Sequence, residues 1–186
     1  MTGSDDKELI RRIARRDQTA MSALYARHNV RLYRYLVRLV RNEAVAEELM
    51  NEVFLETWRK AGTFEGRSAV STWLMSIAHN KAVSLIRKRS EDQLDDAVAV
   101  QIADHDDTPE MVSQKRSKAE AMRVCMEQLS PDHREIIDLV YYHDKSVSEA
   151  AEILEIPENT VKTRMFYARK KLAEFMREAG VDRGWP

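Results

Sequence analysis

SVSEAAEILEIPENTVKTRMFYARKKLAEF, residues 146–175, is the stretch of sequence that decides the fold of the C-terminal part of the chain. Ser146, followed three residues later by Glu149, forms a capping box that predicts the start of a helix. Ile156 and Pro157 then predict a turn into a second helix, because proline suits the first turn of a helix and not its interior. The stretch is therefore predicted to form two helices joined by a short turn.

The second of these helices has two unlike faces. At about 100° per residue, an apolar stripe lies on one side, formed by Val161, Met165, Ala168 and Leu172. The opposite side carries Asn159, Lys162, Thr163, Phe166, Tyr167 and Lys170. Aromatic rings on a basic face can pack on thymine methyl groups while Lys and Thr reach base edges and phosphates. The pattern favours a helix-turn-helix that enters the major groove of duplex DNA; a solvated helical hairpin is the alternative.

Helical spacing of apolar residues continues outward over most of the chain. One helix is predicted to begin at Ser130 and Pro131, as N-cap and first residue, and another precedes it from Val112 to Leu129. Four more are predicted between Lys7 and Arg89, and Gly62 is expected to stop the third of them. Glycine and proline are scarce, which disfavours sheets. The expected fold class is all-α, with two small helical domains.

The net charge of −1 conceals an uneven distribution along the 186 residues. Residues 1–90 contain 17 basic and 10 acidic residues, whereas residues 91–112 contain eight acidic residues and no basic one. An acidic segment with few apolar residues cannot build a core, so it is interpreted as a flexible linker. The predicted domains are residues 1–90 and 113–180, joined by the linker 91–112 and followed by a tail, 181–186.

Several function classes are disfavoured by the sequence. The single cysteine, Cys125, cannot form an intramolecular disulfide, and its apolar helical pattern indicates a buried structural thiol. There is no Gly-rich phosphate loop or nucleophile motif, and the five histidines are scattered, so no enzyme, metal site or cofactor is expected. No apolar run is long enough to cross a membrane or to form a signal peptide, so a cytoplasmic protein is expected.

Two blocks of sequence resemble the extracytoplasmic-function (ECF) group of bacterial sigma-70-family RNA polymerase sigma factors. EQLSPDHREIIDLVYYHDKSVSEAAEILEIPENTVKTRMFYARKKL, residues 127–172, resembles sigma region 4. AEELMNEVFLETWRKAGTFEGRSAVSTWLMSIAHNKAVSLIRKR, residues 46–89, resembles sigma region 2. The blocks stand in the family's order on either side of the acidic segment, and the resemblance covers about residues 8–178. It implies a signal-responsive factor that binds core RNA polymerase and directs it to promoters for transcription initiation.

The resemblance assigns polymerase docking to Glu48, Asn51 and Glu52, here named the docking set. These residues lie at positions i, i+3 and i+4, so they share one face of a helix. In the family, this face contacts the clamp helices of the largest polymerase subunit. Asn51 stands where the family usually has the longer Gln, so the docking geometry is expected to differ in detail. Without the resemblance, the same residues would be interpreted as a solvated helix face.

The resemblance assigns recognition and melting of the promoter −10 element to a loop and the basic helix that follows it. This −10 set consists of Phe64, Arg67, Ser68, His79, Asn80, Lys81, Arg87 and Lys88. A polar loop beside a basic helix suits this task, because single strands are bound by a cationic track with pockets for unstacked bases. Trp73, in the same stretch, is interpreted as a core residue, with a role in DNA melting as the alternative.

The resemblance assigns recognition of the −35 element to the helix-turn-helix. This −35 set consists of Asn159, Lys162, Thr163, Arg164, Phe166, Tyr167 and Lys170. The sequence departs from the family at Glu155 and Asn159, where Gly is common, and at Tyr167, where Arg is common. If Glu155 is left-handed, a non-Gly residue there costs about 1 kcal/mol. The −35 preference is therefore not carried over directly from the family.

The resemblance also implies partners. These are core RNA polymerase, contacted at its clamp helices and at the flap of the second-largest subunit, promoter DNA, and an anti-sigma factor that clamps both domains. The acidic linker would be attracted to the basic RNA channel of polymerase, and a solubilising tether is the alternative. The free protein is expected to be a monomer with no membrane insertion.

Two other classes of protein compete with this interpretation. A helix-turn-helix repressor or activator would bind duplex DNA unaided, as a dimer matched to two half-sites. The sequence offers no apolar dimerisation helix beyond the two domains, which counts against that class. A protein–protein adaptor that uses only the docking set would leave Phe166 and Tyr167 unexplained.

Overall fold

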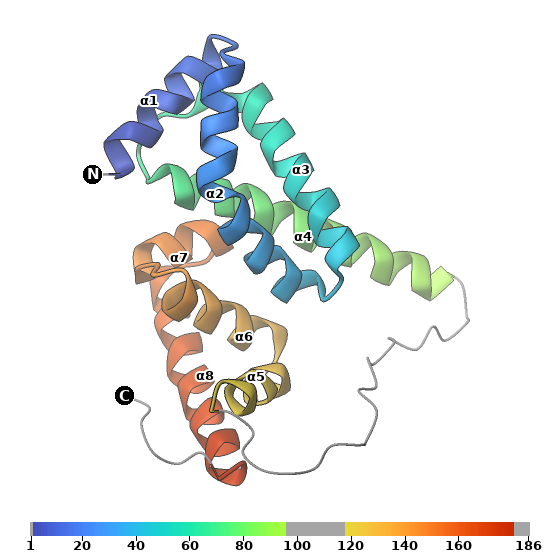
Figure 1. The fold of residues 1–186 in the computed structure, drawn as a ribbon. Coiled ribbons are helices and arrows are strands. Elements are labelled where there is room, and N and C mark those ends of the chain that lie inside the picture. Colours follow the sequence, from blue (N-terminus) through green and yellow to red (C-terminus); the bar gives the residue numbers. More distant parts are fainter. Residues whose placement is uncertain (1, 96–117, 181–186) are drawn as a thin grey trace.

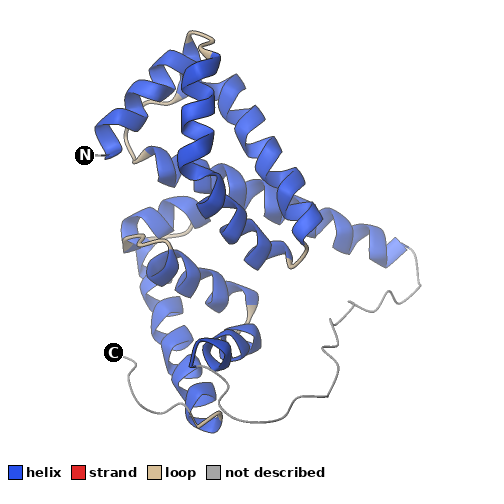
Figure 2. Ribbon diagram, viewed as in Figure 1, coloured by secondary structure: helices blue, strands red, loops and turns tan. Residues whose placement is uncertain are grey.

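The computed structural model describes residues 2–95 and 118–180, and all regular structure in these ranges is helical (Figures 1 and 2). The expected all-α fold is confirmed. The N-terminal unit consists of α1 (Thr2–Ala14), α2 (Gln18–Val40), α3 (Glu43–Lys60), the 3-10 turn η1 (Ala61–Thr63) and α4 (Val70–Asp95). The C-terminal unit consists of α5 (Lys118–Gln128), α6 (Pro131–Ile137), the π-type turn η2 (Asp138–Tyr142), α7 (Val147–Leu154) and α8 (Glu158–Glu178).

Short polar caps divide the N-terminal unit into its helices. The Asp17 carboxylate accepts a hydrogen bond from the Ala20 amide at 3.1 Å and starts α2. Arg41, with a φ of 53°, ends that helix, and the Asn42 side chain caps α3 through the Val45 amide at 3.0 Å. Both caps satisfy amides that have no partner within the helix. Leu24, Leu36, Val53 and Leu74 are among the fully buried side chains that hold the helices together.

The predicted helix starts at Ser130 and Ser146 are confirmed, whereas the start predicted at Val112 lies outside the described residues. Ser130 caps α6 with Pro131 at its first position, and Ser146 and Glu149 form both bonds of the capping box on α7. Glu155, with a φ of 53°, is left-handed and forms the turn of the helix-turn-helix. The cost expected for a non-Gly residue at this position therefore applies. Cys125 is buried on α5, as predicted.

Two predicted boundaries differ from the structure. Gly62 does not stop α3 in a left-handed conformation; the chain passes through η1 and turns at Gly66, with a φ of 72°. Helix α4 continues to Asp95, past the expected linker start at residue 91, because no Gly or Pro interrupts it there. The rest of the predicted linker, 96–112, and the predicted tail, 181–186, lie outside the described residues.

The two units pack against each other. Helix α4 contacts α7, and α2 contacts α6. Figure 1 shows the C-terminal unit lying alongside α2 and α4. Buried apolar residues of both units belong to one cluster, which includes Leu36 and Leu74 from one side and Leu139 and Ile153 from the other. The structure is therefore a closed arrangement of the two units.

Candidate nucleic-acid interface

The −35 set lies on the outer face of α8. The apolar stripe of α8 is buried against the rest of the C-terminal unit; it consists of Val161, Met165, Ala168 and Leu172. On the opposite face, Phe166 and Tyr167 expose 60% and 52% of their surface, and their rings meet edge to face at 5.3 Å. The side chains predicted to face DNA, namely Asn159, Lys162, Thr163, Phe166, Tyr167 and Lys170, are all exposed. The two-faced helix expected from the spacing is confirmed.

One member of the −35 set already has a protein partner. Arg164 is half-buried, and its Nη2 lies 3.1 Å from the Asp132 carboxylate at the start of α6. This ion pair ties α8 to the helix that precedes the helix-turn-helix. A DNA phosphate that binds the Arg164 guanidinium would therefore either displace the Asp132 carboxylate or share the guanidinium with it.

The docking set lies on the outer face of α3. Glu48, Asn51 and Glu52 are all exposed, while the other face of the helix buries Leu49, Met50, Val53, Phe54 and Thr57. Beside this face, α3 and α4 border a groove of about 460 Å³. Lys81 of the −10 set reaches into the same region, with Nζ 3.2 Å from the Glu52 carboxylate and 3.9 Å from that of Glu56. A hydrogen bond from the Lys60 ammonium lowers the pKa of the Glu56 carboxyl, and the nearby charge of Lys81 lowers it further.

The loop members of the −10 set lie beside α1. Phe64 packs on Trp73 with ring centroids 5.0 Å apart, so Trp73 is a half-buried core residue at the foot of the loop. Lys7 Nζ donates to the Gly66 carbonyl at 2.8 Å and ties the loop to α1. Arg67 is exposed and pairs with Glu65 at 2.7 Å, and Ser68 is half-buried. A depression of about 320 Å³, bordered by α1 and this loop, lies next to Lys7.

The helical members of the −10 set point in different directions, because successive residues of a helix are about 100° apart. Lys81 faces α3, whereas His79 and Asn80 face the C-terminal unit. His79 Nδ1 lies 2.7 Å from Glu135 Oε1, and Asn80 Nδ2 donates to Glu155 Oε1 at 2.9 Å. Arg87 and Lys88 are exposed farther along α4. The structure therefore does not bring the −10 set together in one patch.

A second group of polar contacts joins α2 to the C-terminal unit. The Tyr35 hydroxyl donates to Glu135 Oε1 at 2.6 Å, the same oxygen that lies beside His79. Burial raises the pKa of Tyr35 well above its usual value, and the Glu135 charge adds to the effect. Arg38 pairs with the buried Asp138 carboxylate. His143 Nε2 lies 3.3 Å from Asp138 Oδ2, but neither of these buried atoms has a hydrogen-bond partner within the described residues.

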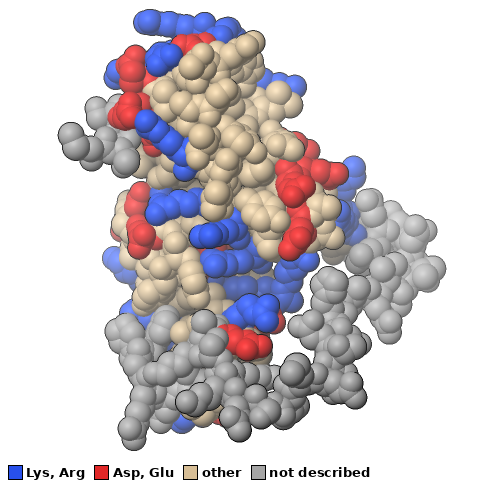
Figure 3. Space-filling view, viewed as in Figure 1, with Lys and Arg blue, Asp and Glu red and all other residues tan. Residues whose placement is uncertain are grey.

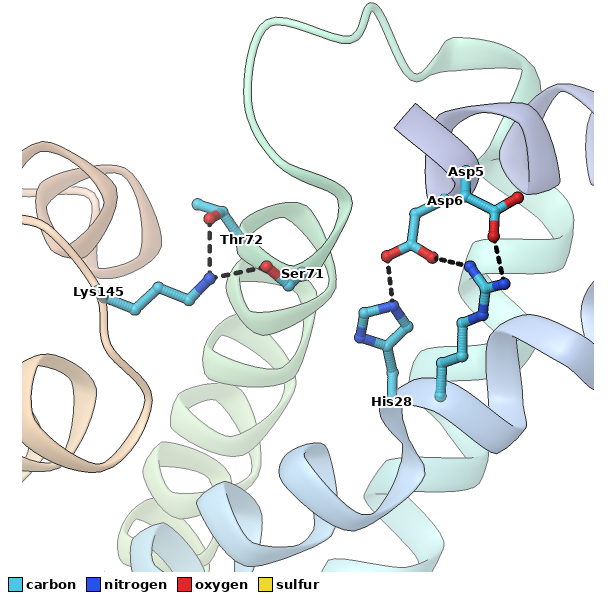
Figure 4. A network of polar contacts seen from close by, with 7 residues as sticks. Asp5, Asp6, His28, Ser71, Thr72 and Lys145 are labelled. Carbon is cyan, nitrogen blue, oxygen red and sulfur yellow. Dashed lines mark hydrogen bonds and ion pairs between the residues drawn. The ribbon is translucent and has the colours of Figure 1, made fainter. Parts of the chain in front are cut away.

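Lys145 is the most deeply inserted cation of the interface. It precedes α7, is 7% exposed, and its Nζ donates to Ser71 Oγ at 2.8 Å and Thr72 Oγ1 at 3.1 Å (Figure 4). Thr72 in turn donates to Glu149 at 2.7 Å. Burial lowers the pKa of Lys145, although Glu149 opposes the effect. Figure 4 also shows Asp6 of α1 holding His28 at 2.9 Å within the N-terminal unit.

The interface between the two units is also marked by positive charge on the molecular surface. Lys and Arg side chains gather across the middle of the face seen in Figure 3, over the region where α2 meets the C-terminal unit. Local sequence patterns did not predict the interface residues Tyr35, Glu135, Asp138 and Lys145. Their partners lie 73 to 100 residues away in the chain, so no local spacing could identify them.

Other kinds of site have little support in the described residues. Within residues 2–95 and 118–180, no cluster of His, Cys, Asp and Glu could hold a metal ion. Among the same residues, no helix combines the length and the apolar character that a membrane span requires.

Comparison with known proteins identifies both units. Residues 24–91 match the family described as Sigma-70 region 2, and residues 119–172 match Sigma-70, region 4. The ECF RNA polymerase sigma factor SigK of Mycobacterium sp. (strain KMS) is 30% identical over 164 residues, which cover 84% of this chain and 83% of SigK. SigK of Mycobacterium tuberculosis (strain ATCC 25618 / H37Rv) is 29% identical over 174 residues, covering 91% and 92%.

Two solved structures have a similar fold. One is the sigma factor RpoE in complex with the anti-sigma factor NepR from Bartonella quintana, with a TM-score of 0.68 and 26% identity over 84% of this chain and 96% of that one. The other is CnrH in complex with the cytosolic domain of CnrY, with a TM-score of 0.67 and 24% identity over 93% and 97%.

Proposed function

The chain belongs to the ECF RNA polymerase sigma factors, and from this membership we propose that it binds core RNA polymerase and directs it to promoters through separate −10 and −35 contacts. One observation carries the proposal. Both family regions are present, and each presents an exposed face of the required chemistry: a polar, acidic face on α3 and a basic, aromatic face on α8.

The docking set is proposed to bind the clamp helices of the largest polymerase subunit. Its three side chains are exposed and lie on one face of α3, and the opposite face is anchored in the core. An acidic patch on a rigid helix suits a basic partner surface, because charge complementarity raises the rate of encounter and sets the register. Contact between the C-terminal unit and the flap of the second-largest subunit is part of the same proposal.

The −35 set is proposed to enter the major groove at the −35 element. Lys162, Thr163 and Lys170 supply hydrogen-bond donors for phosphates and base edges, and Phe166 and Tyr167 supply apolar contacts to thymine methyl groups and sugars. The burial of Val161 and Leu172 holds the helix in a fixed orientation.

The −10 set is proposed to hold the displaced single strand after the duplex opens. The loop at Phe64 to Ser68 lies beside Lys7, and the cations Lys81, Arg87 and Lys88 follow along α4. Because these residues do not form one patch, the strand would have to run from the loop along α4, where the exposed cations Arg87 and Lys88 can contact its phosphates. Control by an anti-sigma factor is proposed from the similar fold of RpoE in its complex with NepR.

In vitro transcription tests the proposal. Purified protein is added to core RNA polymerase of the source organism with a library of its promoters, and transcripts are mapped by sequencing. We expect transcripts that start from a defined promoter class and depend on the added protein. A folded protein that binds core polymerase and yields no promoter-specific transcript would contradict the proposal. Tight duplex binding by the free protein as a dimer, seen in sedimentation, would support a repressor or activator instead.

A further inference from the structure

A row of arginines lies along one side of α2. Four of them follow one another at steps of four, three and four residues: Arg27, Arg31, Arg34 and Arg38. At about 100° per residue they fall within an arc of about 60°, so they share one side of the helix. Arg41, which ends α2, follows three residues later. These five residues are here named the arginine stripe, and none of them belongs to the docking, −10 or −35 set.

The carboxylates that neutralise part of the stripe come from other helices, because the sequence of α2 contains no acidic residue. Arg27 pairs with Asp6 of α1 at 2.8 Å and with the neighbouring Asp5. Arg38 pairs with the buried Asp138 of the C-terminal unit. These contacts account for two of the five positive charges.

The other three arginines keep their charge uncompensated. Arg31 and Arg34 are exposed, and in the part of the chain that the structure describes neither forms an ion pair or a hydrogen bond. Arg41 is also exposed and donates to the Glu127 carbonyl at 3.4 Å, which carries no net charge. The middle of the stripe is therefore free to bind an anion from outside the chain.

Further cations lie close to the stripe. Burial lowers the pKa of Lys145, and among the nearby charges Arg31 acts in the same direction. Burial likewise lowers the pKa of Arg134, and the charge of Arg41 lowers it further. Figure 3 shows Lys and Arg side chains gathered over this region, where α2 meets the C-terminal unit. Like charges held together create a positive surface potential, which raises the local concentration of anionic partners.

The backbone of a nucleic acid fits the stripe better than a protein surface does. Guanidinium groups match phosphate oxygens in paired hydrogen bonds. From Arg27 to Arg38 the stripe spans about 16 Å at 1.5 Å per residue, and over that length one strand of a duplex presents about five phosphates. A specific protein interface has an apolar centre, whereas every member of the stripe is charged.

We propose that the arginine stripe binds the phosphate backbone of duplex DNA independently of sequence. Arg31 and Arg34 contact phosphates directly, and the other members add to the attracting charge. The site goes beyond the proposed function, because it lies outside the three sets that serve polymerase docking and promoter recognition, and it reads no base.

The salt dependence of binding tests the proposal. A short fluorescein-labelled duplex without a promoter is titrated with the full-length protein at a series of salt concentrations. We expect Arg31→Gln/Arg34→Gln to lower the slope of log affinity against log salt by about 1.8, because each lost phosphate contact removes about 0.9. Affinity at low salt should fall about tenfold or more. Arg31→Lys/Arg34→Lys keeps both charges and should keep most of the slope.

A matched control separates the site from net charge. Arg59→Gln/Arg177→Gln removes the same charge from exposed positions of α3 and α8 outside the stripe and should leave the slope unchanged. An equal fall in both glutamine pairs would overturn the site, as would a wild type that binds no duplex at low salt. If the stripe variant keeps duplex binding and loses core polymerase instead, the stripe is a protein-docking surface and the proposal is wrong.

Proximity cleavage gives a second measurement that does not depend on affinity. Arg34→Cys labelled with an iron–EDTA reagent should cut the backbone of the bound duplex, whereas Arg59→Cys labelled in the same way should not. The native Cys125 is buried, and burial raises the pKa of its thiol, so it reacts slowly. Equal cutting from both positions would overturn the site. Because the duplex holds no promoter, a failure of the proposed promoter recognition would appear in the transcription assay and leave these results unchanged.

Discussion

Tyr35 and Glu135 are 100 residues apart in the chain, yet the tyrosine hydroxyl donates a 2.6 Å hydrogen bond to the glutamate carboxylate. Tyr35 is fully buried in α2, and the same carboxylate oxygen lies 2.7 Å from His79 of α4. A single side chain of α6 therefore links the two helices of the N-terminal unit that face the C-terminal unit.

Removing the Tyr35 hydroxyl should destabilise the closed protein. Tyr35→Phe keeps the buried ring and removes one hydrogen bond to a charged acceptor, which corresponds to about 1.5–3 kcal/mol of unfolding free energy. Urea denaturation followed by circular dichroism measures the change. Tyr25→Phe, on an exposed position of α2, is the control and should unfold like the wild type. An unchanged midpoint for Tyr35→Phe would show that the hydrogen bond is not formed in solution.

The docking and −35 faces should be separable by mutation. Lys162→Ala and Phe166→Ala remove exposed side chains of α8, so each should lower −35-dependent transcription about tenfold, the range of one good base contact, and leave the fold intact. Glu52→Arg reverses a charge of the docking set and should instead weaken binding to core polymerase. Glu174→Ala on α8 is the control. Equal loss of core binding in Lys162→Ala, Phe166→Ala and Glu52→Arg would contradict the division of roles.

Acid should weaken the contacts of Glu149. Burial raises the pKa of this carboxyl, but hydrogen bonds from Ser146 and Thr72 and the charge of Lys145 outweigh it, so the net pKa lies below the usual 4.5. A folded pKa below the unfolded one stabilises the protein above the unfolded value, and this stabilisation is lost as the pH falls through the folded value. The unfolding free energy should therefore fall as the pH drops below 4.5.

Glu149→Gln isolates this contribution. The variant should be less stable than the wild type at neutral pH, and the difference between the two should shrink in acid, because the wild type then loses the same charge. Glu174→Gln should show no such convergence with the wild type. Urea titrations at a series of pH values measure both curves. Parallel curves for Glu149→Gln and the wild type would contradict a lowered pKa.

Glu155 combines a strained backbone with a useful side chain. Its φ of 53° costs a non-Gly residue about 1 kcal/mol, while its carboxylate accepts a hydrogen bond from Asn80. Glu155→Gly and Glu155→Ala both lose the carboxylate, but only the glycine relieves the strain. The glycine variant should therefore be about 1 kcal/mol more stable than the alanine variant in urea denaturation. Equal stability would mean that the turn is not left-handed in solution.

Much of the local structure could be predicted from the sequence, because helices are encoded by residues within a few positions of one another. The capping box of Ser146 and Glu149, the N-cap at Ser130 and the two faces of α8 all depend on spacings of three or four residues. The exposed positions of the docking set, and of the −35 set apart from the half-buried Arg164, followed from the same periodicity. The end of α4 did not, because an acidic composition alone does not end a helix.

The arrangement of the two units was decided only by the tertiary structure. Glu135, Asp138 and Lys145 have the composition and spacing of solvated charges, and only their partners in α2 and α4 give them another role. Those partners come from helices that are contiguous in space and distant in sequence, and no periodicity relates them. By itself, the sequence therefore determined the helices, their caps and the apolar and polar faces of α8. The packing of α6 and α7 on α2 and α4 decided that His79 contacts Glu135 and Asn80 contacts Glu155, since each contact joins side chains from both units.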